Sequence, residues 1–448
     1  ETVARLLVDK ELQARAKGQV IWVDEAGLLG VGAMKRVFDI AREQGARVIL
    51  TGDTRQHTAV ERGDAMRLLE TSGALVPADV RKVQRQRGAY KEAVESISRG
   101  ELADGMGRLD AMGAIVEIER AKRYDRIADD YVRLTGSGKS VLAVSPTHRE
   151  GDDVTSKVRE RLRNAGRLRG SDKAFATFDN LGWTEAQRRD GAMYEAGHTV
   201  RFHQHVKGFR KGERATVIAN AGEQGVLVRN AAGLTKLLPL DEAKRFQVYE
   251  ERALDVAVGE RLRITENGMT RDGSRLFNGA TYDVKGFAED GGILLSNGKV
   301  LAPDFGAFAH GYCATSHSSQ GKTVDHVLIA QSSESWGAAS TEQFYVSVSR
   351  GREGVTIYTD DREELRSSVS KSSARPSAMS LAEGEKPAPK KAPQLSPWQE
   401  RALDLARKSI LTRAYASRVE QRLVDKYATL AKSNRRTERG FERERERE

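Results

Sequence analysis

The stretch "QVIWVDEAG" (residues 19–27) joins a short apolar run to two adjacent carboxylates, Asp24 and Glu25. Apolar residues then recur at the spacing of a helix, and a second apolar run ends in another acidic turn, "ARVILTGDTRQ" (46–56). The order strand, helix, strand, in which both strands are continuously apolar, predicts a parallel sheet whose two faces are covered. Because ligands gather at the carboxyl ends of such strands, both acidic turns are candidate site segments.

Length and charge limit the class of protein. The chain has 448 residues, enough for two or three domains, and a net charge of +10, which favours polyanion partners, nucleic acid first. No apolar run reaches the ~18 residues of a membrane span, so we expect no membrane insertion. Cys313 is the single cysteine, which excludes an intramolecular disulfide framework and fits a reducing cytoplasm.

The pattern along the chain predicts an α/β protein with inserted β structure. We expect a first α/β domain over residues 1–100. A second α/β domain is expected to begin over 101–193 and to continue over 311–367. Between these parts, residues 194–310 carry turn signals between short alternating strands, which predicts small antiparallel barrels. Residues 368–397 are rich in Ser, Pro and Lys, as in a disordered linker, and 398–448 read as a basic helical tail.

The two acidic turns suit nucleotide chemistry. A carboxylate pair closing a buried strand fits hydrolysis of Mg²⁺–ATP, with Asp24 holding the metal and Glu25 orienting or deprotonating the attacking water. Gln56 on the next strand would lie within reach of the γ-phosphate. The alternatives are a helix N-cap for the Asp-Glu pair and an ordinary strand-to-loop turn for the second segment.

Two arginines follow further along the chain. Arg85, in "VQRQRGAYKEAVESISRG" (83–100), could bind phosphate bidentately, or it could belong to a solvated basic helix. Arg350, in "FYVSVSRGREGVTIYTD" (344–360), could be an arginine finger that stabilises the negative charge of the transition state. The alternative for Arg350 is the basic end of a helix, where a positive charge suits the helix dipole.

A polar turn feeds the strand expected at 325–330. Its side chains could bind the phosphates of single-stranded nucleic acid and contact a nucleotide at the same time. The alternative is a Ser-rich loop without such a role. The candidates in this turn are Thr315, His317, Ser318, Gln320 and Gly321.

The string "GSGKS" (136–140) looks like a phosphate-binding loop. Such a loop follows a strand and precedes a helix, whereas here a helical pattern comes first and the strand "SVLAVSPT" (140–147) comes after. Lys139 is therefore predicted to be a surface lysine in a helix-to-strand turn. His203 and His205 are predicted to be exposed strand residues rather than metal ligands.

The order of these segments resembles the later motifs of superfamily 1 helicases of the RecD-like branch. The motifs are Asp-Glu-Ala-Gly, Gly-Asp-x-x-Gln, Arg-Gln, Ser-Pro-Thr, Thr-Ser-His-Ser-Ser-Gln-Gly and Val-Ser-Arg-Gly-Arg. The chain is most similar to the helicase portion of conjugative relaxases of the MobF type, over about residues 1–365. The resemblance implies two RecA-like motor domains, the first incomplete, with an SH3-like insertion at 194–310.

The resemblance also implies roles for single residues. Asp24 and Glu25 match the Walker B pair, and Gln56 matches the γ-phosphate sensor. Arg85 and Arg350 match the two arginines that reach the phosphates. Thr147, Thr315 and His317 fall where the family contacts single-stranded DNA. Relatives often carry Glu at the position of Thr323, so a ribose contact there is not carried over.

The implied function is an ATP-dependent, Mg²⁺-dependent translocase moving five-prime to three-prime on single-stranded DNA in conjugative transfer, with other conjugation proteins as partners. The family's phosphate loop and relaxase nuclease would lie upstream of Glu1, so residues 1–448 alone are expected to bind single-stranded DNA without hydrolysing ATP. A non-catalytic DNA-binding module and a recombination or repair helicase outside conjugation are the alternatives.

Overall fold

The computed structural model describes residues 1–59, 63–75, 77–78, 80, 83–220, 222 and 225–373, all within one compact unit, Glu1–Ser377. The tail expected at 398–448, and residues 374–397 of the expected linker, lie outside the described residues. No helix of the described part combines the length and apolar character needed to cross a membrane.

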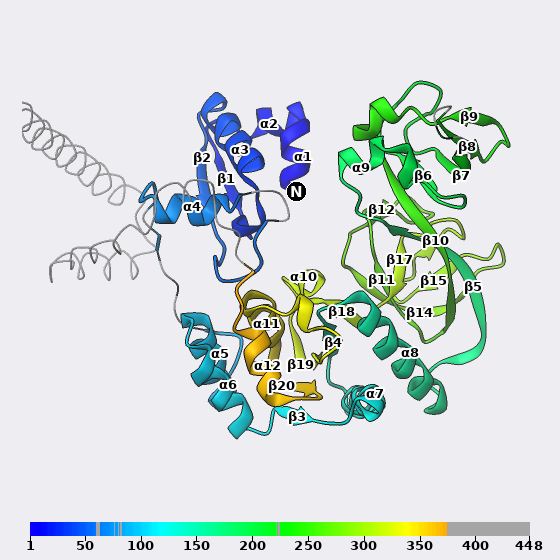
Figure 1. The fold of residues 1–448 in the computed structure, drawn as a ribbon. Coiled ribbons are helices and arrows are strands. Elements are labelled where there is room, and N and C mark those ends of the chain that lie inside the picture. Colours follow the sequence, from blue (N-terminus) through cyan, green and yellow to red (C-terminus); the bar gives the residue numbers. More distant parts are fainter. Residues whose placement is uncertain are drawn as a thin grey trace, which may run out of the picture. The chain divides into compact units, whose positions relative to one another are not determined.

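A small parallel sheet forms the first α/β part, as the sequence predicts. β1 (Val20–Val23) pairs in parallel with β2 (Arg47–Leu50), and α3 (Val31–Glu43) connects them. The short helices α1 (Val3–Val8) and α2 (Lys10–Arg15) precede this unit (Figure 1). Strand and helix share an apolar core that includes Ile21, Val23, Met34, Val37 and Ile40.

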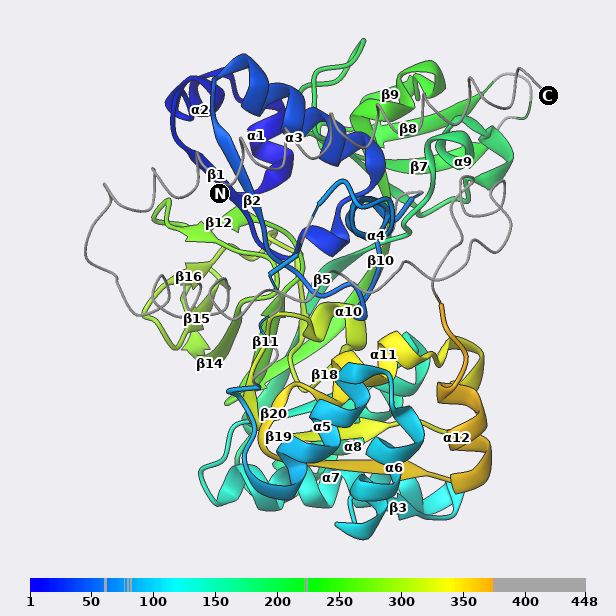
Figure 2. The same ribbon diagram turned by 90° about the vertical axis from the view of Figure 1, so that its left-hand side faces the viewer.

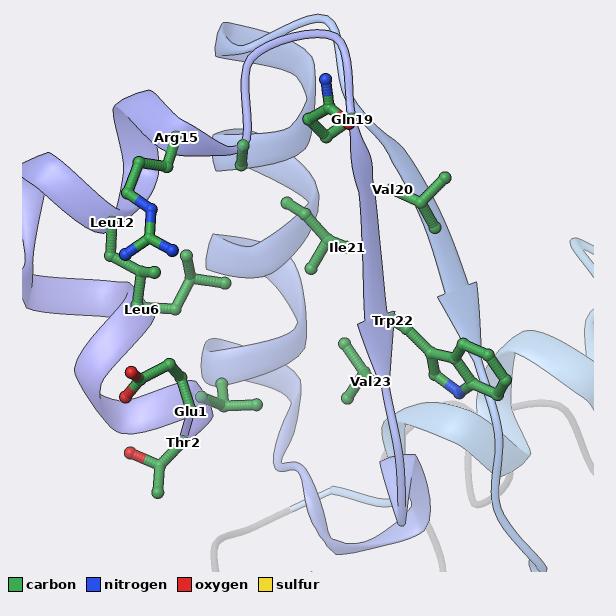
Figure 3. Close-up of a pocket in the computed structure, with 12 residues that line it drawn as sticks. Glu1, Thr2, Leu6, Leu12, Arg15, Gln19, Val20, Ile21, Trp22 and Val23 are labelled. Carbon is green, nitrogen blue, oxygen red and sulfur yellow. The ribbon is translucent and has the colours of Figure 1, made fainter.

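One face of β1 is left open, so the prediction of a sheet with both faces covered is wrong for this strand. Among the described strands β1 pairs only with β2, and its outward side chains Val20 and Trp22 are 53% and 67% exposed. These two side chains point away from α3, whereas Ile21 and Val23 point toward it (Figure 3). A cavity of about 310 Å³ is lined by β1 and the first two helices, and reaches Val23, the residue before Asp24.

The second α/β part contains a five-stranded parallel sheet in the order β18-β4-β19-β20-β3 (Figure 2). The strands are β3 (Ile115–Glu117), β4 (Val141–Ser145), β18 (Cys313–Thr315), β19 (Val324–Ala330) and β20 (Gly351–Thr359). This arrangement confirms the predicted return of the α/β pattern after the β-rich region.

Helices cover both faces of this sheet with separate apolar clusters. One cluster involves α5 (Gly88–Arg99), α6 (Leu102–Ala111), α11 (Thr341–Val348) and α12 (Arg362–Val369). The other involves α7 (Arg120–Gly136) and α8 (His148–Asn164). Two further short helices are α4 (Ala65–Thr71), after β2, and α10 (Ser316–Ser319), directly after β18.

The "GSGKS" string is the end of α7 and not a phosphate loop. Ser137 caps the helix, Gly138 takes the left-handed conformation at φ 82°, and β4 begins two residues after Lys139. Lys139 Nζ lies 3.0 Å from a carboxylate oxygen of Glu353, and both side chains are exposed. The prediction of a surface lysine in a helix-to-strand turn is confirmed.

The antiparallel part begins earlier than the sequence pattern indicated. β5 (Arg169–Asn180) pairs along most of its length with β10 (Phe246–Val258), although the interpretation from sequence started this part at residue 194. Residues 169–180 contain Gly, Ser, Asp and Lys, so they read as a loop, and ten of the twelve are exposed or half-buried. Pairing with β10 therefore makes this segment a strand without a clear alternating pattern.

Two antiparallel sheets make up this part. The first has the order β5-β10-β6-β7-β8-β9, and the second has the order β16-β15-β14-β11-β17. The remaining strands of the first sheet are β6 (Thr199–Phe202), β7 (Arg214–Asn220), β8 (Val226–Asn230) and β9 (Thr235–Leu237). Those of the second are β11 (Arg261–Ile264), β14 (Thr281–Phe287), β15 (Ile293–Leu295), β16 (Val300–Leu301) and β17 (Phe308–His310). The short α9 (Glu185–Arg189) precedes β6, and β12 (Gly268–Met269) forms a hairpin with β13 (Arg275–Leu276).

The end of the second α/β part also differs from the prediction. The expected linker starts at residue 368, yet Ser368 and Val369 are fully buried in α12. The chain continues against α11, where Thr341 N donates to Lys371 O at 2.9 Å. Residues 368–373 therefore belong to the folded part, because contacts with α11 outweigh their Ser-rich composition.

Candidate functional site

The two acidic turns at the carboxyl ends of β1 and β2 are in direct contact. Ala26 N donates to Thr51 O at 2.8 Å, and Thr51 N donates to Val23 O at 2.9 Å. A Cβ at Gly52 would lie only 3.2 Å from Ala26 N, so the close approach of the turns depends on this glycine. The parallel pairing thus brings the two predicted segments together.

Asp24 and Glu25 do not cap a helix. Asp24 Oδ1 accepts hydrogen bonds from Glu25 N at 3.0 Å and from Thr51 Oγ1 at 2.9 Å. Glu25 has φ 53°, the one positive φ found at a non-glycine residue in the described chain. The turn after Glu25 has no side-chain cap, and α3 is preceded by Gly30. The N-cap alternative is therefore wrong, and the unusual backbone of Glu25 marks this turn as a candidate functional position.

The turn after β2 is organised by Asp53. Its Oδ1 accepts from Arg55 N at 2.9 Å, and its Oδ2 accepts from Gln56 Nε2 at 3.4 Å and from Tyr345 OH at 2.9 Å. Tyr345 lies on α11, so this carboxylate joins the first α/β part to the second. Gln56 Oε1 is buried without a hydrogen-bond partner among the described residues.

A second connection reaches Glu25 from the polar turn after β18. Gln320 Nε2 donates to Glu25 Oε2 at 2.8 Å, while Gln320 Oε1 is buried without a partner in the described part. Gly321, at φ 77°, turns the chain toward β19. Buried amide oxygens without partners are uncommon, and two of them beside the acidic turns indicate room for a ligand or water that donates hydrogen bonds.

Arg85 and Arg350 meet at Ser349. Arg85 Nη1 donates to Ser349 O at 2.8 Å, and Arg350 Nη2 donates to Ser349 Oγ at 2.7 Å. Arg350 is 2% exposed, and within the described residues neither arginine has a carboxylate at ion-pair distance. Burial and, to a lesser extent, the charge of Arg85 lower the pKa of Arg350 to about 10, while Glu25 opposes the shift. Two close cations, one of them buried, without an acidic partner form a site suited to an anion.

The solvated-helix alternative does not fit Arg85, whereas the helix-end alternative remains open for Arg350. Arg85 precedes α5, which begins at Gly88, and its guanidinium contacts Ser349, so it is not part of a solvated helix. Arg350 lies two residues after the end of α11, and its Nε donates to Val346 O in the last turn at 2.8 Å, as a basic side chain at a helix end does. Arg352, two residues further on, is the exposed one and pairs with Asp325 at 2.7 Å.

His57 is a site residue that the sequence analysis missed. Its buried ring stacks on the ring of His317 with centroids 3.5 Å apart, and its Nε2 lies 2.9 Å from Ser316 Oγ. The pKa of His57 is lowered to about 3, chiefly by desolvation and also by the nearby His317 and Arg350, against an opposing effect of Glu342. The signal in the sequence was its place directly after Gln56. Asp53 lies in the predicted acidic turn, but its contact with Tyr345 was missed, because it joins residues far apart in the chain.

The candidate DNA-contacting residues lie at one edge of the second sheet. β4 and β18 are parallel neighbours with Ser145 opposite Thr315, so Thr147 and Thr315 both follow the carboxyl ends of adjacent strands. Each threonine is an N-cap: Thr147 Oγ1 accepts from Glu150 N at 3.4 Å, and Thr315 Oγ1 accepts from Ser318 N at 3.4 Å. The structure brings these residues together, and His317 connects them to the acidic turns through His57.

The comparisons with known proteins agree with the motif order. A family model described as an AAA domain matches residues 1–120. The multifunctional conjugation protein TraI of Escherichia coli (strain K12) is 22% identical over 421 residues, covering 81% of this chain and 23% of TraI. The chain is similar to conjugative transfer proteins. The conjugal transfer protein TraA of Rhizobium radiobacter is also 22% identical, over 76% of this chain and 24% of TraA. The chain thus spans about a quarter of the length of these relatives, and the resemblance to conjugation proteins is confirmed.

Solved helicase structures are also similar in part. The crystal structure of Pif1 helicase from Candida albicans is 17% identical with a TM-score of 0.37, covering 83% of this chain and 79% of that chain. The Pif1 helicase from Bacteroides in complex with ADP-AlF3 and ssDNA is 14% identical with a TM-score of 0.31, covering 78% and 71%.

Proposed function

We propose that this chain is part of an ATP-dependent helicase that moves along single-stranded DNA, five-prime to three-prime, during conjugative transfer. The observation that carries the proposal is the group formed by Glu25, Gln320, Arg85 and Arg350. One carboxylate, one amide and two arginines without acidic partners converge where the two parallel sheets meet. The similarity to the conjugation proteins TraI and TraA supports the same proposal.

The site fits a nucleotide and Mg²⁺. The arginines and the two unpartnered amide oxygens offer charge and hydrogen-bonding capacity for a phosphate chain and its water. Asp24 is exposed directly after β1 and would be a protein ligand of Mg²⁺. Mg²⁺ accepts such a site, since it keeps several waters and takes further oxygens from phosphate.

Each residue then has a definite task. ATP supplies the phosphoryl group that is transferred to water. Glu25, oriented by Gln320, would accept the proton of the attacking water on the carboxylate oxygen that Gln320 leaves free. Arg350 and Arg85 would stabilise the negative charge that builds up on the phosphate oxygens, and Gln56 would contact the γ-phosphate.

The DNA path would follow the edge formed by Thr147, Thr315, Ser318 and His317. Hydroxyls and backbone amides at helix starts suit phosphate contacts that carry no base specificity. The His57–His317 stack supports this path, because His57 directly follows Gln56 in the chain. We further propose that the antiparallel sheets correspond to the SH3-like insertion of the relatives.

The phosphate-binding loop would come from outside the 448 residues, which contain no Gly-x-x-x-x-Gly-Lys-Thr or -Ser sequence. We propose that the open edge and exposed apolar face of β1 receive that part of the motor domain. The test compares residues 1–448 with a longer chain that includes the preceding segment. Residues 1–448 are expected to bind oligo-dT without Mg²⁺-dependent ATP hydrolysis, and the longer chain to hydrolyse ATP when DNA is added. Strong ATP hydrolysis by residues 1–448 alone, or none by the longer chain, would contradict the proposal.

A further inference from the structure

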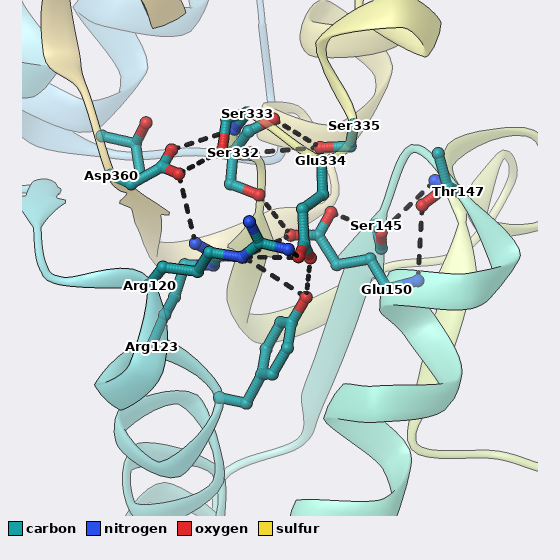
Figure 4. A network of polar contacts seen from close by, with 12 residues as sticks. Arg120, Arg123, Ser145, Thr147, Glu150, Ser332, Ser333, Glu334, Ser335 and Asp360 are labelled. Atoms are coloured by element: carbon teal, nitrogen blue, oxygen red, sulfur yellow. Dashed lines mark hydrogen bonds and ion pairs between the residues drawn. The ribbon is translucent and has the colours of Figure 1, made fainter.

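A buried polar network ties together the carboxyl ends of β4, β19 and β20 (Figure 4). Its centre is Arg123 on α7, which is fully buried, and Glu150 on α8, which is 1% exposed. Arg123 Nη2 lies 3.3 Å from Glu150 Oε1. Asp360 and Glu334 lie at 3.7 and 3.5 Å from the same guanidinium.

Glu150 uses both carboxylate oxygens inside the protein. Its Oε1 also accepts from Ser332 Oγ at 2.8 Å, and its Oε2 accepts from Ser145 Oγ at 3.0 Å. A buried charge is stable only when it is paired and its remaining lone pairs are satisfied. Glu150 meets this condition, whereas Arg123 leaves Nε and Nη1 without hydrogen-bond partners in the described part. Both carboxylate oxygens of Glu150 therefore have hydrogen-bond partners, whereas only part of the Arg123 guanidinium does.

The same residues fix the turn that carries Thr147. Ser145 Oγ, which donates to Glu150, accepts a bond from Thr147 N at 3.3 Å. Glu150 N in turn donates to Thr147 Oγ1 at 3.4 Å. The hydroxyl oxygen of Thr147 is the acceptor in this cap. The hydroxyl proton of Thr147 can therefore be donated to a group outside the protein. Thr147 is half-buried, so such a group can reach it.

We propose that Glu150, neutralised by Arg123, is a positioning residue that sets the direction in which Thr147 donates its hydroxyl proton to a phosphate of single-stranded DNA. The inference rests on the proposed DNA contact of Thr147. Glu150 acts through Ser145 and through its own backbone N–H, and does not touch the DNA. A purely structural ion pair would stabilise the fold without affecting the affinity for DNA.

Asp130 provides a matched control on the same helix as Arg123. It is 6% exposed, pairs with Arg126 and Arg133, and accepts from Tyr358 OH at 2.8 Å on β20. Asp130→Asn disturbs a buried carboxylate network of the same sheet that has no bond to the Thr147 turn. It therefore reports on loss of stability alone.

The test measures binding of labelled oligo-dT by the longer helicase chain at fixed salt, together with thermal unfolding. Thr147→Val, Glu150→Gln and Ser145→Ala are each expected to weaken binding by about tenfold, the size of one hydrogen bond to a charged group. The Thr147→Val/Glu150→Gln double variant is expected to bind no more weakly than either single variant. Asp130→Asn is expected to lower the unfolding temperature and leave the affinity unchanged. Ser145→Ala keeps the test valid if Glu150→Gln does not fold.

The outcomes separate the two proposals. If Thr147→Val binds like the wild type, the proposed DNA contact at Thr147 is wrong. If Thr147→Val weakens binding while Glu150→Gln and Ser145→Ala do not, the DNA contact stands and the positioning role is overturned. Additive losses in the double variant, or an equal loss in Asp130→Asn, would also overturn the positioning role.

Discussion

Gln320 donates a hydrogen bond of 2.8 Å to Glu25 across a separation of 295 residues. Gln320 follows the polar turn at the end of β18, and Glu25 follows the first strand of the other parallel sheet. A carboxylate suited to activating water is thus oriented by the segment that also carries the candidate DNA-contacting residues. A change in the position of that segment on DNA binding would change the environment of Glu25.

Replacing Gln320 by Glu tests this relationship. Gln320→Glu places two carboxylates within hydrogen-bonding distance, and their repulsion should move Glu25 from its position. We expect DNA-stimulated ATP hydrolysis by the longer chain to fall by about tenfold to a hundredfold, with affinity for DNA in the absence of nucleotide nearly unchanged. Gln204→Glu, on an exposed loop of the antiparallel part, adds the same charge and should have no effect. Unchanged hydrolysis in Gln320→Glu would show that the hydrogen bond has no role in turnover.

Arg350 should matter far more than its neighbour Arg352. Arg350→Ala is expected to lower the rate of ATP hydrolysis by about 10³-fold, because under the proposed function it removes a cation that stabilises the transferred phosphate. Arg350→Lys should not restore the rate, since lysine lacks the planar fork of donors. Arg352→Ala, which removes only an exposed ion pair with Asp325, should behave as the wild type in steady-state kinetics. Equal losses in the two alanine variants would argue against a role for Arg350 at the phosphate.

His57 makes stability depend on pH. Its pKa is lowered from 6.5 to about 3, so the unfolded chain binds a proton below pH 6.5 that the folded protein excludes. The free energy of unfolding should therefore be fully retained above pH 6.5 and fall as the pH drops toward 3, by up to about 1.4 kcal/mol per pH unit. Denaturant unfolding at pH 7 and pH 5 measures this loss.

The control for this effect is the difference between variants, because other groups also titrate. In His57→Gln the loss between pH 7 and pH 5 should shrink by about 1–2 kcal/mol, while His148→Gln, at the exposed start of α8, should lose as much as the wild type. If His57→Gln and the wild type lose the same free energy, the ring is not held neutral in the contact with His317.

Trp22 reports on what covers β1. Its indole is 67% exposed in the described structure, so acrylamide should quench its fluorescence strongly in residues 1–448. The contribution of Trp22, taken as the difference between the wild type and Trp22→Phe, should be quenched several times less in the longer chain. Equal quenching in both chains would show that the preceding segment does not pack on this face.

The local pattern of the sequence was enough to predict the elements around the acidic turns. Apolar runs and helical spacing located β1, α3 and β2, and the reversed order of helix and strand identified Lys139 as a surface residue. These features depend on neighbours in the chain, which periodicity detects directly.

Contacts between distant segments could not be predicted in this way. The His57–His317 stack and the Tyr345–Asp53 hydrogen bond join different parts of the chain, and no local pattern encodes them. The strand β5 was missed for a related reason, because its partner β10 supplies the hydrogen bonds that its polar composition hides. Arg123 and Glu150 are charged yet buried, and no local pattern distinguishes them from the exposed charges of α7 and α8.

The most direct test of the proposed function is the rate of DNA-stimulated ATP hydrolysis by the longer chain carrying Glu25→Gln. The amide keeps the size of the side chain but cannot accept a proton, so the rate should fall by about 10²- to 10⁴-fold while oligo-dT binding stays within about twofold. Glu43→Gln, at the exposed end of α3, is the matched control and should keep full activity. A Glu25→Gln variant that hydrolyses ATP at the wild-type rate would contradict the assignment of this site as the catalytic centre.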